Sequence, residues 1–199
     1  METDAKIVSL ADDAEAAWMR ATKLLLAGGV AVIPTDTVYG LAAHPDFPAA
    51  VERLYTIKGR AAKKPIALLA ADAAGAARFL GRALPVAAER LAERHWPGAL
   101  TLVLPTAQEG VFEGLRVPDH DWTRRLIAAC GGVLRVTSAN LSGERPATDA
   151  LAALAEVGLS ADLVVDDGVS PGGIASTVVR VSPEGELTVL RQGGVKIGE

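Results

Sequence analysis

Short apolar runs alternate along the chain with segments of helical length, and glycine, proline or capping residues stand between them. Asp12 and Asp13 can cap a helix that runs to about Ala27 and ends at a glycine pair. Residues 30–33 then form a short buried strand. The same pattern predicts further helices at about 48–57, 72–80, 85–95, 121–130 and 148–157, and further strands at 66–70, 99–104, 115–117, 133–136, 163–165, 177–181 and 187–190.

This order of elements predicts an α/β fold in which helices cover a sheet. The last predicted strands follow one another without a helix between them, which favours a mixed sheet over a purely parallel one. The chain has 199 residues, half of them hydrophobic, and this supplies enough apolar side chains for a core. We expect a single domain over residues 1–199.

Composition and charge limit the cellular compartments and the binding partners that are compatible with the sequence. The single cysteine, Cys130, excludes an internal disulfide and a multi-cysteine metal site. The N-terminus lacks the pattern of a signal peptide, and the longest apolar stretch, residues 24–34, is too short to span a bilayer. We therefore expect a cytoplasmic protein without membrane contact. The net charge of −4 argues against a broad nucleic-acid-binding surface, although a local basic cleft is compatible with it.

Two loops rich in hydroxyl groups follow predicted strands, at residues 34–40 and 137–143. In open α/β sheets, ligands bind outside the carboxyl ends of strands, so these loops suggest a site for a small polar ligand. Ordinary turns, in which threonine, serine and asparagine satisfy backbone donors, are an equally good explanation of either loop alone.

Cations gather in one short stretch, where Lys58, Arg60, Lys63 and Lys64 fall within seven residues. Such a cluster suits a polyphosphate or an acidic partner, and a solvated charge run is the alternative. Arg116 and Arg191 each stand at or just beyond the end of a predicted strand, where either could bind a carboxylate or phosphate, or remain a surface charge. The glycine pair after Arg191 predicts a mobile tail.

Several common signatures are absent from the sequence. It has no Walker A motif, no Rossmann glycine pattern and no nucleophile elbow, and its three histidines lack metal-ligand spacing. A nucleotide, if bound, is therefore not held by the commonest nucleotide-binding motif.

An ordered set of motifs resembles the YrdC family of threonylcarbamoyl-AMP synthases. The set runs in family order from about residue 20 to the C-terminus and consists of Pro34-Thr35-Asp36-Thr37-Val38-Tyr39-Gly40-Leu41, Lys58-Gly59-Arg60, Lys64-Pro65, Trp96-Pro97-Gly98-Ala99-Leu100-Thr101, Arg116-Val117-Pro118, Ser138-Ala139-Asn140-Leu141-Ser142-Gly143, Ser176-Thr177-Val178 and Leu190-Arg191. Each motif alone is weak, and the ordered set is specific.

The resemblance implies an open, twisted mixed sheet flanked by helices, with a deep concave basic site. It places L-threonine on Thr35, Arg116, Ser138 and Ser176. It places ATP on Lys58, Arg60, Lys64, Asn140, Thr148 and Arg191, with Lys58 and Arg60 as catalytic residues. The sequence departs from the family pattern at Ala61, Leu69 and Thr137, and it ends soon after Arg191, without the extra C-terminal domain of longer members.

The implied reaction joins ATP, L-threonine and bicarbonate into threonylcarbamoyl-AMP, the activated intermediate for modifying a tRNA adenosine. It needs no protein nucleophile, so positioning and charge stabilisation carry it, with Mg²⁺ held mainly by phosphate oxygens and water rather than by protein ligands. The product would pass to tRNA-modification partner proteins, and weak RNA binding is compatible with the cation cluster.

Three other functions compete with this one. A module that binds double-stranded RNA or tRNA without chemistry would explain the cations but not the hydroxyl-rich loops. A carbamoyl-transfer domain like those of hydrogenase maturation proteins would need cysteine-rich and acylphosphatase-like regions for which 199 residues and one cysteine leave no room. A purely structural protein would leave the polar loops without a purpose.

Overall fold

The computed structural model describes residues 6–59 and 65–197. Its helices are α1 Leu10–Leu26, α2 Pro48–Lys58, α3 Ala73–Leu80, α4 Val86–His95, α5 Asp121–Ala129 and α6 Ala150–Ala153, which the π-helical segment η1, Leu154–Gly158, continues. Its strands are β1 Ile7–Ser9, β2 Val30–Ile33, β3 Gly40–Ala43, β4 Leu68–Ala70, β5 Leu100–Pro105, β6 Phe112–Arg116, β7 Val133–Ser138, β8 Leu163–Asp166, β9 Thr177–Val181 and β10 Leu187–Arg191.

Within the described residues, ten strands form one sheet in the order β1-β8-β2-β3-β7-β4-β6-β5-β9-β10. Parallel pairs, such as β2 with β8 and β5 with β9, stand beside antiparallel pairs, such as β3 with β7 and β5 with β6. The prediction of a mixed sheet is therefore confirmed. The strands β1 and β3 were not predicted, because residues 7–9 and 40–43 are too short and too uniform to show an alternating pattern.

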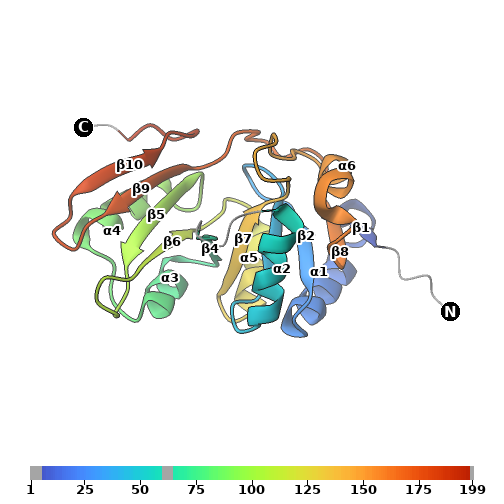
Figure 1. Ribbon diagram of the computed structural model, residues 1–199, viewed down its shortest axis with the longest axis horizontal. Coiled ribbons are helices and arrows are strands. Elements are labelled where there is room, and N and C mark those ends of the chain that lie inside the picture. The colour runs from blue at the N-terminus through green and yellow to red at the C-terminus, as the bar shows by residue number, and fades with distance from the viewer. Residues whose placement is uncertain (1–5, 60–64, 198–199) are drawn as a thin grey trace.

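One half of the sheet, made of β1, β8, β2, β3 and β7, is covered on both faces (Figure 1). Val30 and Val32 of β2 face a core that includes Leu54 of α2 and Ala153 of α6. The alternate residues of β2, Ala31 and Ile33, face a second core on the other side of the sheet. This core also contains Leu25 of α1 and Leu126 and Ile127 of α5. Burial on both faces explains why β2 is an unbroken apolar run rather than an alternating one.

The other half, made of β4, β6, β5, β9 and β10, carries the helices α3 and α4 on one face (Figure 1). Leu100, Leu102 and Leu104 of β5 are fully buried against these helices, whereas Thr101 and Val103 point to the opposite face. No described helix contributes to the lining of that opposite face. This uncovered face of the sheet forms the floor of a cavity.

Two predicted helix ends differ from those observed. Helix α1 begins one turn early at Ser9, whose side chain accepts a hydrogen bond from the Ala11 amide, and Asp13 interrupts it with non-helical backbone while accepting bonds from the Glu15 and Ala16 amides. Helix α2 ends at Lys58 rather than at residue 57, and Gly59 after it adopts left-handed backbone (φ 57°). No described helix is both long enough and apolar enough to cross a membrane.

Candidate functional site

A cavity of about 560 Å³ lies over the uncovered face of the sheet. Its floor comes from alternate residues of β6, β5 and β9, and its wall comes from the segments that follow β2 and that end β7. Because β2 and β7 both pair antiparallel with β3, their carboxyl ends lie at the same edge of the sheet. Five of the predicted site residues line this single cavity: Thr35, Arg116, Ser138, Ser176 and Arg191.

Arg116, the last residue of β6, is the central cation of the cavity. Its Nε donates to the Gly98 carbonyl at 2.9 Å, its Nη1 donates to Thr37 Oγ1 at 2.7 Å, and its Nη2 donates to Asp36 Oδ1. The side chains of Arg116 and Asp36 are only 7% and 12% exposed. A guanidinium carries five N–H groups, so two of them remain without an acceptor among the described residues.

The loop after β2 holds Arg116 through a directed chain of hydroxyl groups. Thr35 Oγ1 donates its proton to the Val38 carbonyl at 2.7 Å and lies 3.0 Å from Thr37 Oγ1. Because a hydroxyl has one proton, Thr37 must donate to Thr35, and Arg116 in turn donates to Thr37. In this arrangement Thr35 has no proton left for a ligand, and its hydroxyl orders the loop that holds Arg116.

Arg191 and Ser176 form a second hydrogen-bonded group in the same cavity. The Nε and Nη2 atoms of Arg191 lie 3.1 and 2.8 Å from the Ser176 carbonyl oxygen, and Nη2 lies 3.2 Å from Ser176 Oγ. Ser176 Oγ is also 2.8 Å from Thr101 Oγ1. Arg191 was expected beyond the last strand, but it ends β10, after a register shift that follows Val189.

The segment after Arg191 is bound to the sheet, contrary to the expected mobile tail. The Gly193 and Val195 amides donate to Thr177 Oγ1, which donates in turn to the Val195 carbonyl. A Cβ atom on Gly193 would lie 2.2 Å from the Ala175 carbonyl oxygen, so only glycine permits this approach. The tail therefore supports the strand end that carries Ser176.

Arg116 and Arg191 both line this part of the cavity, and Asp36 pairs with Arg116. Burial lowers the pKa of Arg116 most, the nearby Arg191 charge lowers it further, and Asp36 opposes both effects. The two guanidinium groups therefore repel one another, and the Asp36 carboxylate, which pairs with Arg116, offsets part of this repulsion. This arrangement favours a bound anion, which would relieve the repulsion.

Lys58 and Asn140 lie beside this cavity rather than in its lining. Lys58 is 3% exposed, and its ammonium donates to the carbonyls of Ser138 and Asn140, both at 2.5 Å, and to Asn140 Oδ1 at 3.2 Å. It therefore joins the end of α2 to the end of β7. Thr137 and Ser138 belong to β7 rather than to the predicted loop, and Thr148 is half-buried and accepts a bond from the Ser170 amide through its carbonyl.

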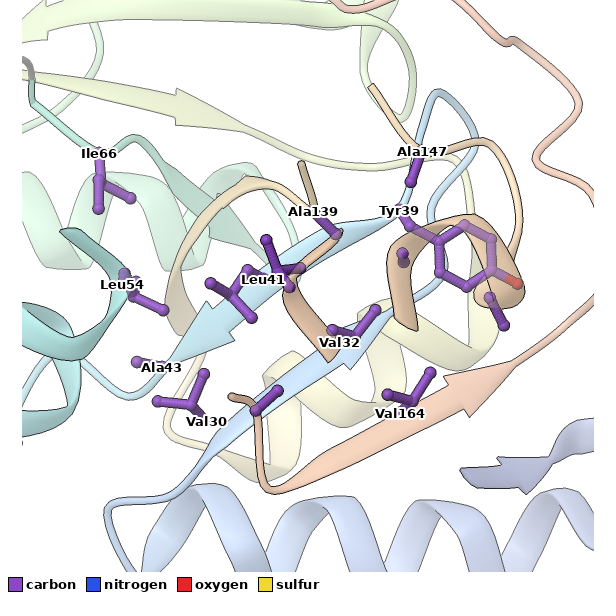
Figure 2. Packing of buried hydrophobic residues seen from close by; sticks show 14 of the residues in the cluster. Val30, Val32, Tyr39, Leu41, Ala43, Leu54, Ile66, Ala139, Ala147 and Val164 are labelled. Atoms are coloured by element: carbon purple, nitrogen blue, oxygen red, sulfur yellow. The ribbon is translucent and has the colours of Figure 1, made fainter. Parts of the chain in front are cut away.

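Tyr39 ties three loops together behind the cavity, where Figure 2 shows it beside Ala139 and Ala147. Its amide donates to the Ala147 carbonyl, and its own carbonyl accepts from the Ala139 amide. Its hydroxyl donates to the Gly168 carbonyl at 2.7 Å and accepts from the Asp167 amide at 3.0 Å. Burial raises the pKa of Tyr39 to about 12, so the phenol stays protonated and keeps both bonds.

A model of the Sua5/YciO/YrdC family, described as telomere recombination, matches residues 23–193. The chain belongs to this family. The match covers the β2 loop, Arg116, Ser138, Ser176 and Arg191, which are the parts of the chain that build the cavity.

Named relatives and a solved structure agree with the family match. A Bacillus subtilis protein named threonylcarbamoyl-AMP synthase is 35% identical over 185 residues, covering 88% of this chain and 53% of that protein. A human protein of the same name is 32% identical over 204 residues, covering 94% and 72%. The structure of P. abyssi Sua5 complexed with L-threonine matches with a TM-score of 0.83 and 30% identity, covering 94% of this chain and 57% of that one. The chain thus spans little more than half of the B. subtilis and P. abyssi proteins.

The comparison confirms the predicted fold class, an open mixed sheet flanked by helices, because Sua5 shares it. Of the predicted departures from the family pattern, Leu69 and Thr137 both line the cavity, while Ala61 lies outside the described residues. The predicted ATP residues Arg60 and Lys64 also lie outside the described residues, so their placement stays a prediction.

Sequence reasoning assigned no role to Asp36, Thr37 and Thr101, which position Arg116 and Ser176. Asp36 and Thr37 lie inside a motif quoted for the Sua5/YciO/YrdC resemblance, and Thr101 is the polar residue between the buried leucines of β5. The residues that the structure describes contain no group of three or more histidine, cysteine, aspartate or glutamate side chains that could hold a metal ion.

Proposed function

We propose that the chain is a threonylcarbamoyl-AMP synthase, which condenses ATP, L-threonine and bicarbonate into threonylcarbamoyl-AMP and pyrophosphate. The observation that carries the proposal is that Arg116 and Arg191 line one cavity together with the hydroxyl groups of Ser138 and Ser176. This site suits a ligand that is anionic, small and hydroxylated. Relatives that are 32–35% identical to the chain bear this enzyme's name, which supports the same assignment.

The threonine carboxylate would bind the two N–H groups of Arg116 that have no acceptor among the described residues. A planar guanidinium suits a carboxylate because two parallel N–H groups match its two oxygens. The hydroxyls of Ser138 and Ser176 line the same cavity and would receive the ligand's polar atoms. L-threonine bound to P. abyssi Sua5 supports this choice of amino acid.

The reaction would proceed in two steps that need no covalent bond to the protein. The threonine amine attacks bicarbonate, a C–N bond forms, and water leaves to give the carbamate. A carbamate oxygen then attacks the α-phosphorus of ATP, and the bond from that phosphorus to the bridging oxygen breaks, so its electron pair leaves with pyrophosphate. The protein would contribute orientation and positive charge, which are the main sources of rate in such transfers.

Arg191 would face the α-phosphate, because it contacts Ser176 and lines the same cavity as Arg116, where the carboxylate would bind. Lys58 would act by fixing the Ser138 carbonyl and the Asn140 side chain, which it contacts directly. Arg60, Lys64 and Thr148 remain proposed nucleotide contacts. Mg²⁺ would arrive with ATP on phosphate oxygens and water, and it would offset phosphate charge.

The product would supply an adenylate to the enzyme that modifies tRNA, so a tRNA-modification protein is the proposed downstream partner. Direct RNA binding, if present, would be weak because the chain's net charge is −4. The cytoplasm is the proposed location, since ATP, bicarbonate and tRNA are all present there.

The test is the release of pyrophosphate by the purified chain. We expect release to require ATP, L-threonine and bicarbonate together, and to fall when Arg116 is replaced by methionine. The Arg90→Ala variant is the control, because Arg90 is exposed on α4 and outside the cavity lining. Release that is independent of threonine would contradict the proposal and would leave a simple nucleotide hydrolase.

A further inference from the structure

The cavity has a second end that none of the predicted site residues occupies. Phe112 at the start of β6 and Arg180 on β9 both line it, and the guanidinium carbon of Arg180 lies 4.1 Å from the centroid of the Phe112 ring. At this distance the ring face attracts the cation and holds the guanidinium over the ring.

Strand register places this end well away from Arg116. Phe112 lies four residues before Arg116 on β6. Arg180 lies on β9, four residues after Ser176, which directly precedes that strand. Because a strand rises about 3.3 Å per residue, the two ends are about 13 Å apart. Val103 of β5 pairs with both Gly114 and Arg180, which shows that β6, β5 and β9 form one continuous floor between the ends.

Arg180 differs from Arg116 and Arg135, two other arginines of the sheet, in forming no ion pair among the described residues. Arg116 and Arg135, both on sheet strands, pair with Asp36 and Glu113. Among the described residues, Arg180 forms no ion pair, and its contact is with the Phe112 ring. Its positive charge is therefore uncompensated by described side chains, and its N–H groups are available at the cavity.

We propose that Arg180, held by Phe112, binds the β- and γ-phosphates of ATP and receives the leaving pyrophosphate. This inference rests on the proposed function, which puts a carboxylate at Arg116 and the α-phosphate at Arg191. A ligand that reaches from Arg191 to Arg180 must be an elongated anion. The triphosphate of ATP is such an anion, because its β- and γ-phosphates extend away from the α-phosphate. Guanidinium N–H groups bind phosphate oxygens through charge-assisted hydrogen bonds.

The register of β4 supports a phosphate at this end. Leu68 pairs with Leu115 in a parallel register, and Ala67 lies beside Gly114, so the chain before β4 runs next to β6 in the direction of Phe112. Pro65 also lines the cavity, and in the sequence it directly follows Lys64, a residue already assigned to ATP by resemblance. When the bond to the α-phosphorus breaks, negative charge gathers on the pyrophosphate, and Arg180 would stabilise it there.

The experiment compares the affinities of ATP and AMP for the full chain and for its variants by calorimetry. We expect Arg180→Ala to weaken ATP binding roughly 10-fold or more, the loss of a charge-assisted bond, and to leave AMP binding unchanged. Arg180→Lys should recover part of the ATP affinity. Phe112→Leu should weaken ATP binding by a smaller factor because it keeps the bulk and removes the ring that orients Arg180. Arg90→Ala, on the exposed face of α4, should change neither affinity.

Two outcomes would overturn the inference. An equal loss of ATP and AMP affinity in Arg180→Ala would mean that the guanidinium stacks on the adenine base. Unchanged affinities for both nucleotides would mean that Arg180 is a surface charge. The proposed function is tested separately by product formation in the unaltered chain: a chain that yields no threonylcarbamoyl-AMP but discriminates ATP from AMP through Arg180 would refute the function and support the phosphate site.

Discussion

Replacing Asp36 with asparagine removes the one acidic partner of Arg116 while keeping the shape of the side chain. The amide oxygen can still accept a hydrogen bond from Nη2. The negative charge is lost, however, and this charge is what raises the pKa of Arg116 against the lowering effects of burial and Arg191. Arg116 would remain buried among neutral groups and a second cation. The variant should therefore be less stable without ligand.

The magnitude follows from the burial of the pair. Its side chains are 12% and 7% exposed, and breaking a pair buried to this degree costs about 3–5 kcal/mol. Because the amide keeps one hydrogen bond, we take the lower end, about 3 kcal/mol. For a chain of this size each kcal/mol shifts the melting temperature by about 2–4 °C, so the expected fall is about 6–12 °C.

The assay is thermal unfolding of both proteins with and without L-threonine. A carboxylate ligand supplies the missing negative charge, so threonine should raise the melting temperature of Asp36→Asn more than that of the unaltered chain. Glu15→Gln is the control, because the Glu15–Arg125 pair lies on the surface with side chains 55% and 51% exposed, and its loss should change little. Equal melting temperatures for Asp36→Asn and the unaltered chain would refute the electrostatic account of the cavity.

The remaining predictions concern specificity and the elements that support the site. Valine lacks the threonine hydroxyl and leaves site hydroxyls unpaired, so its kcat/KM should be roughly 10⁴-fold lower; comparable turnover would exclude a hydroxyl-reading site. Tyr39→Phe should lose roughly 1–3 kcal/mol in urea unfolding, because the Asp167 amide and Gly168 carbonyl lose their partner. Since burial raises the pKa of Tyr39 to about 12, stability should fall between about pH 10 and 12, and Tyr39→Phe should lack that part of the fall. Gly193→Ala should displace the tail and loosen Arg191 from Ser176, which titration with ATP would record as weaker binding.

Much of the fold could be predicted from local sequence signals. The strand at residues 177–181 was predicted with its observed bounds, and α3 and β2 were predicted to within a residue, because caps, glycines and apolar runs mark these elements directly. The strands β1 and β3 could not be predicted from local signals, since β1 pairs with the distant β8, and β3 pairs with the distant β7 as well as with the neighbouring β2. The predicted start of α1 was also wrong because of Asp13. This residue does cap helical turns, but it lies inside a helix that begins after Ser9.

The candidate site was predictable in its residue types and not in its connections. Hydroxyl-rich segments after two strands did indicate that Thr35 and Ser138 share one cavity. The sequence could not show that Asp36 and Thr37 hold Arg116, because these contacts join residues about 80 positions apart. Nor could it show that Thr35 donates its proton to the nearby Val38 carbonyl, because that bond depends on the conformation of the loop. Lys58 shows the same limit, since its position in a cation cluster suggested a phosphate while its described bonds go to protein carbonyls.

The most direct test of the central claim is mass spectrometry of a reaction that contains the purified chain, ATP, L-threonine and bicarbonate labelled with carbon-13. The account predicts a threonylcarbamoyl-AMP peak whose mass increases by one carbon-13 label, and whose amount falls when Arg116 is replaced by methionine. A reaction that consumes ATP but gives only unlabelled AMP would contradict the account, because bicarbonate would then have no part in the chemistry of this cavity.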